Sequence, residues 1–148
     1  MSLLTINEFP KGAFTDEIVL TPQDFTGTTA AAETITYSVP AGSAVVGCGV
    51  KVVTPFSGAS LSAVALDIGE TADPDGYIDA MNIFTSGDTF AYNSGDLLDG
   101  TTSVSDFFAT ADTIDILFSP DTDNDAPYSL NELTTGEIKL KFEICDLN

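Results

Sequence analysis

Apolar and polar side chains alternate with a period of two along most of this chain. In residues 136–145, every second residue from Ile138 to Ile144 is apolar, and the residues between them are Glu or Lys. Successive side chains of a β-strand point to opposite faces of a sheet, so this period predicts strands with one buried face. We expect strands at residues 16–20, 33–39, 44–53, 60–68, 89–93, 103–108, 113–119 and 136–145. Short strands separated by turns predict an all-β fold, an antiparallel, jelly-roll-like β-sandwich.

Three segments depart from this alternation. Asp73-Pro-Asp-Gly76 carries residues typical of a tight turn, and residues 76–84 are the one place where we expect a helical turn. Residues 1–14 hold large apolar side chains without a strict period, which predicts an extended N-terminal arm before a sandwich domain of residues 15–148. Burying these side chains against another protein is favourable, so we predict that the arm binds a neighbouring chain. Its candidate contact residues are Leu3, Leu4, Ile6, Phe9 and Phe14.

Gly47 and Gly49 occupy alternate positions of one predicted strand and leave a flat face that another layer or chain can approach closely.

The sequence also predicts which side chains are buried. The two cysteines, Cys48 and Cys145, are too few for a disulfide framework and are expected to be free thiols. The residues that share the face of Cys48 in this register are Val46, Val50 and Val52. Phenylalanines near predicted loops and strand ends are expected in the core, with a role in contacts as the alternative; they are Phe56, Phe84, Phe90, Phe107 and Phe108.

The charge of the chain excludes several classes of partner. It has 23 acidic residues and four lysines, with no Arg or His, and 16 of the carboxylates lie between Lys51 and Lys139. A phosphate backbone or an anionic membrane is repelled by such a surface, so we expect neither nucleic acid nor a membrane as partner. Without His or Arg, catalytic triads, imidazole metal sites and arginine clamps cannot form, and we expect no enzymatic activity. A hydrolase with paired carboxylates is the remaining enzymatic alternative.

The start of the chain bears on where the protein is made. Residues 1–6 have neither the basic start nor the long apolar stretch of a secretory signal. No run in the sequence reaches the length of a membrane-spanning helix. We therefore expect synthesis in a cytoplasm.

The sharpest local motif is the acidic segment from Asp121 to Glu132. Its acidic residues occupy positions 1, 3, 5 and 12, with Ser129 at position 9, which is the ligand spacing of an EF-hand calcium loop. Ala126 stands where that loop needs a glycine, and the flanks are predicted strand and loop. We therefore expect a solvated loop and no cofactor, with calcium binding as the alternative. The candidate calcium ligands are Asp121, Asp123, Asp125 and Glu132.

Residues 40–84 run through a Pro-Ala-Gly turn, a long β-branched strand, a Phe-Ser-Gly turn, Leu-Asp-Ile-Gly and Asp-Pro-Asp-Gly-Tyr. Residues 134–140 read Thr-Thr-Gly-Glu-Ile-Lys-Leu. Over roughly residues 35–145 this pattern resembles short virion structural proteins of tailed bacteriophages. Neither the N-terminal arm nor residues 121–125 belong to the shared pattern, and the family offers no catalytic residues to carry over.

The resemblance implies a non-enzymatic β-sandwich, often trimeric, that decorates or cements a capsid or forms part of a fibre or spike. Our first hypothesis is a capsid decoration (cement) protein, bound as a homotrimer to the outer face of a phage head after synthesis in the host cytoplasm. Its partner is then the major capsid protein or another virion protein. The second hypothesis is a phage fibre or tail module that binds a receptor or glycan, and the third is a calcium-dependent binding module.

Overall fold

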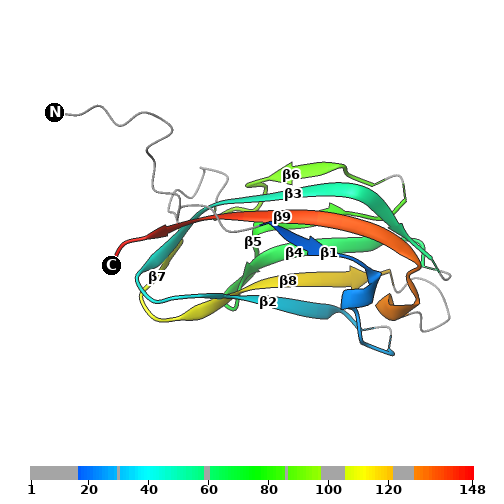
Figure 1. Cartoon of the computed structure of the whole chain (residues 1–148), viewed down its shortest axis with the longest axis horizontal. Helices are drawn as coiled ribbons and strands as arrows, with labels where there is room; N and C mark the ends of the chain where they lie inside the picture. Colours follow the sequence, from blue (N-terminus) through cyan, green and yellow to red (C-terminus); the bar gives the residue numbers. More distant parts are fainter. Residues whose placement is uncertain (1–16, 30, 59–60, 86, 98–105, 122–128) are drawn as a thin grey trace.

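The computed structural model of this chain describes residues 17–29, 31–58, 61–85, 87–97, 106–121 and 129–148. In this part of the chain, two antiparallel β-sheets pack face to face (Figure 1). The first sheet contains β1 (Ile18–Leu20), β3 (Ser43–Ser57), β6 (Phe90–Tyr92), β7 (Asp106–Phe108) and β9 (Thr135–Asp146). The second sheet contains β2 (Glu33–Val39), β4 (Val64–Glu70), β5 (Asp73–Asn82) and β8 (Asp112–Pro120). Two 3-10 helices also occur there, η2 (Pro22–Asp24) and η3 (Leu130–Glu132). None of the helices in the described ranges has the length and apolarity to cross a membrane.

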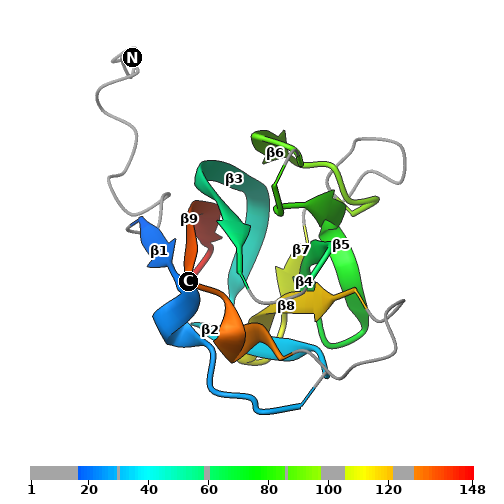
Figure 2. The same ribbon diagram turned by 90° about the vertical axis from the view of Figure 1, so that its right-hand side faces the viewer.

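The connections between strands follow the order of a jelly roll. The first sheet has the order β1-β9-β3-β6, with β7 also paired to β3, and the second has the order β2-β8-β4-β5. Apart from β4 and β5, strands that are neighbours in a sheet are not consecutive in the sequence, because most connections pass from one sheet to the other. Figure 2 shows β9, β3 and β6 on one side of the interior and β2, β8, β4 and β5 on the other. This arrangement confirms the predicted all-β, jelly-roll-like β-sandwich.

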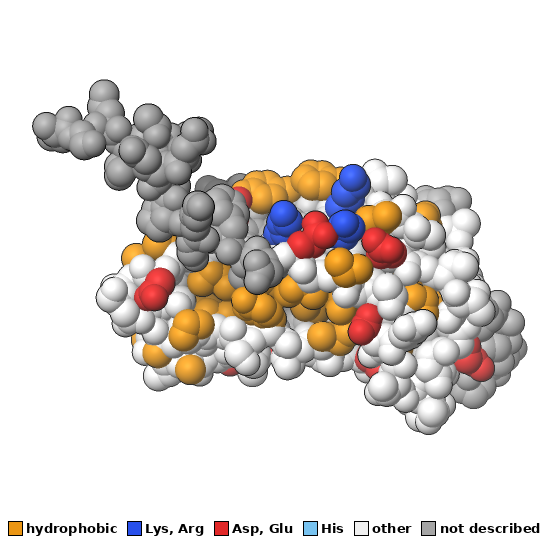
Figure 3. Space-filling view, viewed as in Figure 1, with side chains coloured by type: hydrophobic (Ala, Val, Ile, Leu, Met, Phe, Trp, Pro, Cys, Tyr) orange, Lys and Arg blue, Asp and Glu red, His pale blue; other side chains and the backbone are white. Residues whose placement is uncertain are grey.

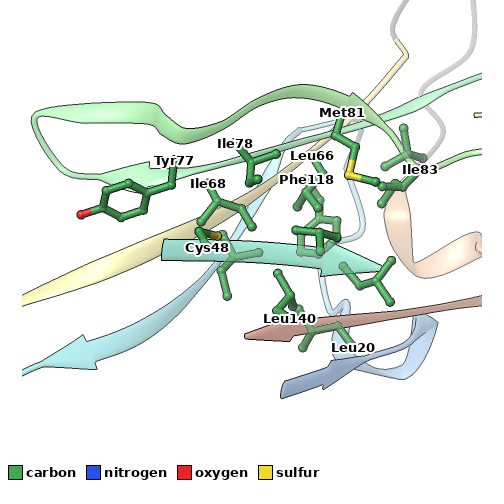
Figure 4. Packing of buried hydrophobic residues seen from close by; sticks show 14 of the residues in the cluster. Leu20, Cys48, Leu66, Ile68, Tyr77, Ile78, Met81, Ile83, Phe118 and Leu140 are labelled. Atoms are coloured by element: carbon green, nitrogen blue, oxygen red, sulfur yellow. The ribbon is translucent and has the colours of Figure 1, made fainter. Parts of the chain in front are cut away.

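The core lies between the two sheets, where the predicted alternation places it. On β8 every second side chain from Ile114 to Phe118 is buried, and on β9 every second one from Ile138 to Phe142. Figure 4 shows side chains of both sheets meeting in this layer, among them Leu140 on β9 and Phe118 on β8. Each fully buried side chain of this size contributes about 1.5–3 kcal/mol relative to an exposed one. The residues between them belong to the outer faces of the two sheets, with Asp115 and Leu117 on β8 and Lys139 and Lys141 on β9.

The prediction for residues 73–84 was wrong. The chain turns at Thr71–Ala72 instead, and β5 begins at Asp73 and runs on to Asn82 as a strand. Its register against β4 shifts between Ile78 and Met81, so these two residues, three apart, are both buried. A β-bulge of this kind imitates the spacing of a helix in the sequence. Ala80, inside the bulge, has φ +47°, and its N–H donates to Asp67 Oδ1 at 2.7 Å.

A second bulge corrects the predicted face of Cys48. The register between β3 and β9 shifts between Val45 and Gly47, which turns Val46 out of the ladder and leaves it 41% exposed. The other members of that face, Cys48, Val50 and Val52, are buried as predicted, and both cysteines are free. The bulge adds one residue to β3, and strict alternation does not allow for it.

The phenylalanines divide between the core and the surface. Phe56, Phe84 and Phe108 are buried as predicted. Phe90 and Phe107 are 64% and 54% exposed, so the core prediction is wrong for these two. Phe107 and Phe108 are consecutive strand residues and must point to opposite faces, so burying one of them exposes the other.

Some predicted segments differ in extent or lie outside the described residues. The strand predicted at residues 60–68 is displaced, since β4 covers Val64–Glu70. The predicted N-terminal arm, residues 1–14, lies outside the described ranges, as do Asp123 and Asp125.

Candidate protein-binding face

Large apolar side chains that remain exposed are distributed unevenly between the two sheets. In the described ranges they come from strands of the first sheet or from the tail after β9, and the second sheet contributes none. These residues are Val19, Val46, Val53, Phe90, Tyr92, Phe107 and Leu147. Exposed apolar side chains that gather on one face of a soluble protein indicate a contact surface. The outer face of the first sheet is therefore the candidate site.

Lysines gather on the same face. Lys51 of β3 lies directly opposite Lys139 of β9, and Lys141 lies opposite Gly49 in the neighbouring row. Figure 3 shows the blue lysine side chains close together over β3 and β9, with acidic side chains among them. We call the outward side chains of these rows the lysine face; its members are Val19, Lys51, Phe90, Tyr92, Lys139 and Lys141.

The lysine face encloses a groove of about 330 Å³. Gly49 forms part of its floor, and Tyr92 on β6 pairs with Gly49, so that a Cβ at Gly49 would lie 3.4 Å from Tyr92 Cδ2. A Cβ at Gly47 would lie 2.8 Å from the carboxylate of Glu143. The close approach predicted at these glycines is therefore made within the same chain, by the side chains of Tyr92 on β6 and Glu143 on β9. Without side chains at the glycines, the groove keeps an open, largely apolar floor between aromatic and cationic walls.

Acidic neighbours balance only part of the positive charge in the groove. Lys139 Nζ lies 2.9 Å from Glu17 Oε1, and this contact lowers the pKa of Glu17 and raises the pKa of Lys139. Within the described residues, Lys51 and Lys141 form no ion pair. A carboxylate that entered the groove would be attracted by Lys51 and Lys141, and it would offset the repulsion between Lys51 and Lys139, which lie directly opposite each other.

Tyr92 is held in place by hydrogen bonds at the end of β6. Its hydroxyl donates to Glu143 Oε1 at 3.1 Å. The pKa of Tyr92 is raised mainly by withdrawal from water and, to a smaller extent, by this hydrogen bond. Next to it, Asn93 adopts φ +47°, accepts a hydrogen bond from Cys48 N at 2.8 Å through Oδ1, and donates its own N–H to Cys48 O at 3.0 Å. Asparagine tolerates this left-handed conformation better than most residues. The amide of Asn93 therefore fixes the short edge strand that carries Phe90 and Tyr92.

A separate group of carboxylates lies on β5 and in the turn after β6. Asp75, Asp79 and Asp96 line a recess of about 120 Å³. The pKa of neighbouring Asp73 is raised, first by withdrawal from water and then by hydrogen bonding with Asp75 and the charges of Asp96 and Asp75. No lysine is among the causes of that shift. We call Asp73, Asp75, Asp79 and Asp96 the acidic cluster.

The candidate calcium ligands are engaged locally at the two ends of their loop. Asp121 Oδ2 accepts a hydrogen bond from Ser62 Oγ, and Glu132 Oε2 accepts one from Ser129 N at 3.2 Å in a capping box at η3. In the described ranges, no group of three or more His, Cys, Asp or Glu side chains has the arrangement to hold a metal ion. Calcium binding by this loop stays the alternative to a solvated loop, and partner binding by the arm stays a prediction.

Sequence reasoning did not identify the lysine face or Asn93. The alternation of residues 136–145 already placed Lys139 and Lys141 on an outward face. The missing information was the pairing of β3 with β9, which brings Lys51 beside them. A sequence of one chain carries no direct signal for that pairing.

Comparison with known proteins gives a likeness of fold. No protein-family model matches this chain, and no curated protein matches it in sequence. Among solved structures, a chain of the cyanophage Pam1 capsid asymmetric unit is similar with a TM-score of 0.57 and 15% identity. The match covers 85% of this chain and 79% of that one. The sandwich described above is therefore similar in fold to a chain of a phage capsid assembly.

Proposed function

We propose that this chain is a non-enzymatic structural protein of a phage virion, a capsid decoration (cement) protein that binds the outer face of the head as a homotrimer. The observation that carries the proposal is the likeness of fold to a chain of the cyanophage Pam1 capsid asymmetric unit, which extends over 85% of this chain. The partner on the head is the major capsid protein or another virion protein. The attachment segment is the N-terminal arm, with Leu3, Leu4, Ile6, Phe9 and Phe14 as its contact residues.

The surface chemistry supports a structural role on the outside of a particle. A net charge of −19 keeps particles apart in solution and leaves the protein without affinity for the packaged nucleic acid. The chain contains no His or Arg for the usual catalytic constellations, and burial raises the pKa of the Cys48 thiol, which disfavours a reactive thiolate there. The exposed apolar residues gathered on the first sheet are typical of a surface that contacts protein.

The proposal is tested by locating the protein on virions. Antibodies raised against the recombinant chain are applied to purified virions and the gold label is imaged by electron microscopy. We expect label over the whole head surface. A second arm of the experiment adds the recombinant protein to particles that lack it and measures head binding by cosedimentation. Absence of the chain from virions would overturn the proposal.

A second candidate is a fibre or tail module that binds a receptor or glycan. The groove favours it, because the exposed rings of Phe90 and Tyr92 beside Lys51 and Lys141 offer the stacking and hydrogen-bonding groups that sugars use. Label confined to the tail or to fibres would support this function in place of decoration.

A further inference from the structure

The chain carries two surfaces of opposite character, and within the described residues no ion pair joins a lysine of one to Asp73, Asp75 or Asp79 of the other. The lysine face is on the outer side of the first sheet, whereas Asp73, Asp75 and Asp79 of the acidic cluster belong to β5 in the second sheet. In Figure 2, β9 and β5 lie on different sides of the interior. A contact between the two surfaces therefore needs a second copy of the chain.

Each surface has a charge that such a contact would neutralise. On the lysine face, Lys51 and Lys141 form no ion pair with other described residues. In the acidic cluster, Asp75 and Asp79 are exposed, and the pKa of Asp73 and of Asp67 is raised first by withdrawal from water and then by the neighbouring carboxylates. In a chain with four lysines and 23 acids, three of the lysines are on this one face, so an acidic surface is repelled least there.

We propose that the lysine face of one copy binds the acidic cluster of a second copy, head to tail, and that this contact joins the subunits of the oligomer. In this contact Asp75 and Asp79 of one copy lie beside Lys51 and Lys141 of the other, and the exposed rings of Phe90 and Tyr92 line the same groove. Complementary charges across an interface fix its register and exclude wrong partners. This inference depends on the proposed function in one respect: it names the contact between the subunits of the oligomer proposed there.

The charge pattern also decides between kinds of symmetry. A two-fold dimer joined through the lysine face would bring the lysines of one copy close to the lysines of the other. A head-to-tail contact joins two different surfaces, and such contacts close into a ring when the rotation between copies allows it. Opposite charges on the two surfaces therefore favour a ring over a two-fold dimer joined through the lysine face.

The first experiment removes the positive charge. The variant Lys51→Gln/Lys141→Gln is compared with Thr34→Glu/Thr36→Glu, which lowers the net charge equally through exposed residues of β2 on the other sheet. Sedimentation velocity at several protein concentrations measures association, and circular dichroism checks the fold of each variant. We expect the lysine variant to dissociate at concentrations about tenfold or more above those of the wild type. The threonine variant should associate as the wild type does.

The second experiment exchanges the two charges. Lys51→Glu/Lys141→Glu and Asp75→Lys/Asp79→Lys should each be monomeric alone, because each brings like charges together at the contact. A chain with all four substitutions has the wild-type net charge and regains opposite charges at the contact. We expect it to recover the mass of the wild-type oligomer.

The outcomes separate this inference from the proposed function. A wild-type chain that stays monomeric, a lysine variant that keeps its oligomer, or a fourfold variant that fails to recover it while folded would each overturn the inference. Lysine variants that keep the oligomer but lose binding to heads would assign the face to the capsid instead, and would leave the decoration role intact. A recovered oligomer in the fourfold variant supports the inference even where virion labelling fails.

Discussion

Lys51 and Lys139 lie directly opposite each other on β3 and β9, so two of the chain's four lysines form one cross-strand pair. Two like charges in this position repel each other, and the single described ion pair, between Lys139 and Glu17, offsets part of that repulsion. A chain with 23 acids has many positions at which a lysine would be attracted by its surroundings. Concentrating the lysines on one face instead gives that face a charge opposite to the rest of the surface.

Replacing Asn93 should weaken the edge strand that carries Phe90 and Tyr92. Asn93→Ala removes the acceptor of the Cys48 N–H and places an alanine at φ +47°, so we expect a loss of about 1–3 kcal/mol in the free energy of unfolding. Asn93→Gly is the matched control, because glycine accepts the conformation but lacks the amide. Urea denaturation should rank the wild type above the glycine variant and the glycine variant above the alanine variant. Equal stability of all three would contradict this role.

Mild acidification should stabilise the fold. The folded state raises the pKa of both Asp67 and Asp73, mainly by withdrawing them from water, so it holds protons more readily than the unfolded chain. The stability that this supplies is complete below the ordinary carboxyl pKa of 3.8 and is lost as the pH rises through the raised value. We therefore expect the melting temperature to rise as the pH is lowered from 7 toward 4.

One substitution tests whether the acidic cluster causes this pH effect. Asp73→Asn should reduce the slope of melting temperature against pH. Glu137→Gln removes one carboxylate near Lys139 on the other sheet, and it should leave the slope as it is. Identical slopes in the wild type and in Asp73→Asn would show that the cluster does not cause the effect.

Chelation should leave the stability unchanged. Glu132 is occupied by the capping box at η3, and Ala126 replaces the glycine that a calcium loop needs, so we expect the same melting temperature with EDTA and with calcium. A fall in melting temperature with EDTA that disappears in Asp123→Ala would instead establish a calcium site, because a ligand that binds only the native state stabilises it. Differential scanning calorimetry measures both.

Duplex DNA should not bind despite the lysine face. Only three of the four lysines are on that face, and Glu17 and Glu143 lie in the same groove, so a phosphate backbone gains few contacts and meets repulsion elsewhere. We expect no shift of a labelled duplex in a gel at micromolar protein and moderate salt. A shift that weakens steeply as salt is raised would contradict this.

Removing the N-terminal arm should separate attachment from folding. A chain that lacks residues 1–12 should keep the wild-type melting temperature and oligomer mass but lose binding to heads, because the arm contributes apolar area only where it docks. Calorimetry, sedimentation and cosedimentation with particles measure the three properties. A truncated chain that unfolds or dissociates would show that the arm belongs to the sandwich or to the contact between subunits.

The sequence by itself determined the fold class and most of the core. Alternation from Ile138 to Phe142 or from Ile114 to Phe118 fixes which side chains face inward, because the strand period is two whatever the partner strand is. The same rule failed at Val46 and did not identify the strand at residues 76–82, because bulges change the period locally. A bulge depends on how two paired strands fit, and that information is not local to either segment.

Only the tertiary structure decided the candidate site. Lys51, Phe90 and Lys139 each read as an ordinary strand residue, and nothing near them in the sequence connects them. They form one face because the jelly roll pairs β3 with both β6 and β9, which are distant in the chain. Local physical chemistry sets which way a side chain points from its own strand. Which side chains then stand beside it is set by long-range pairing, and this pairing placed the charge of a few lysines on one surface of an acidic protein.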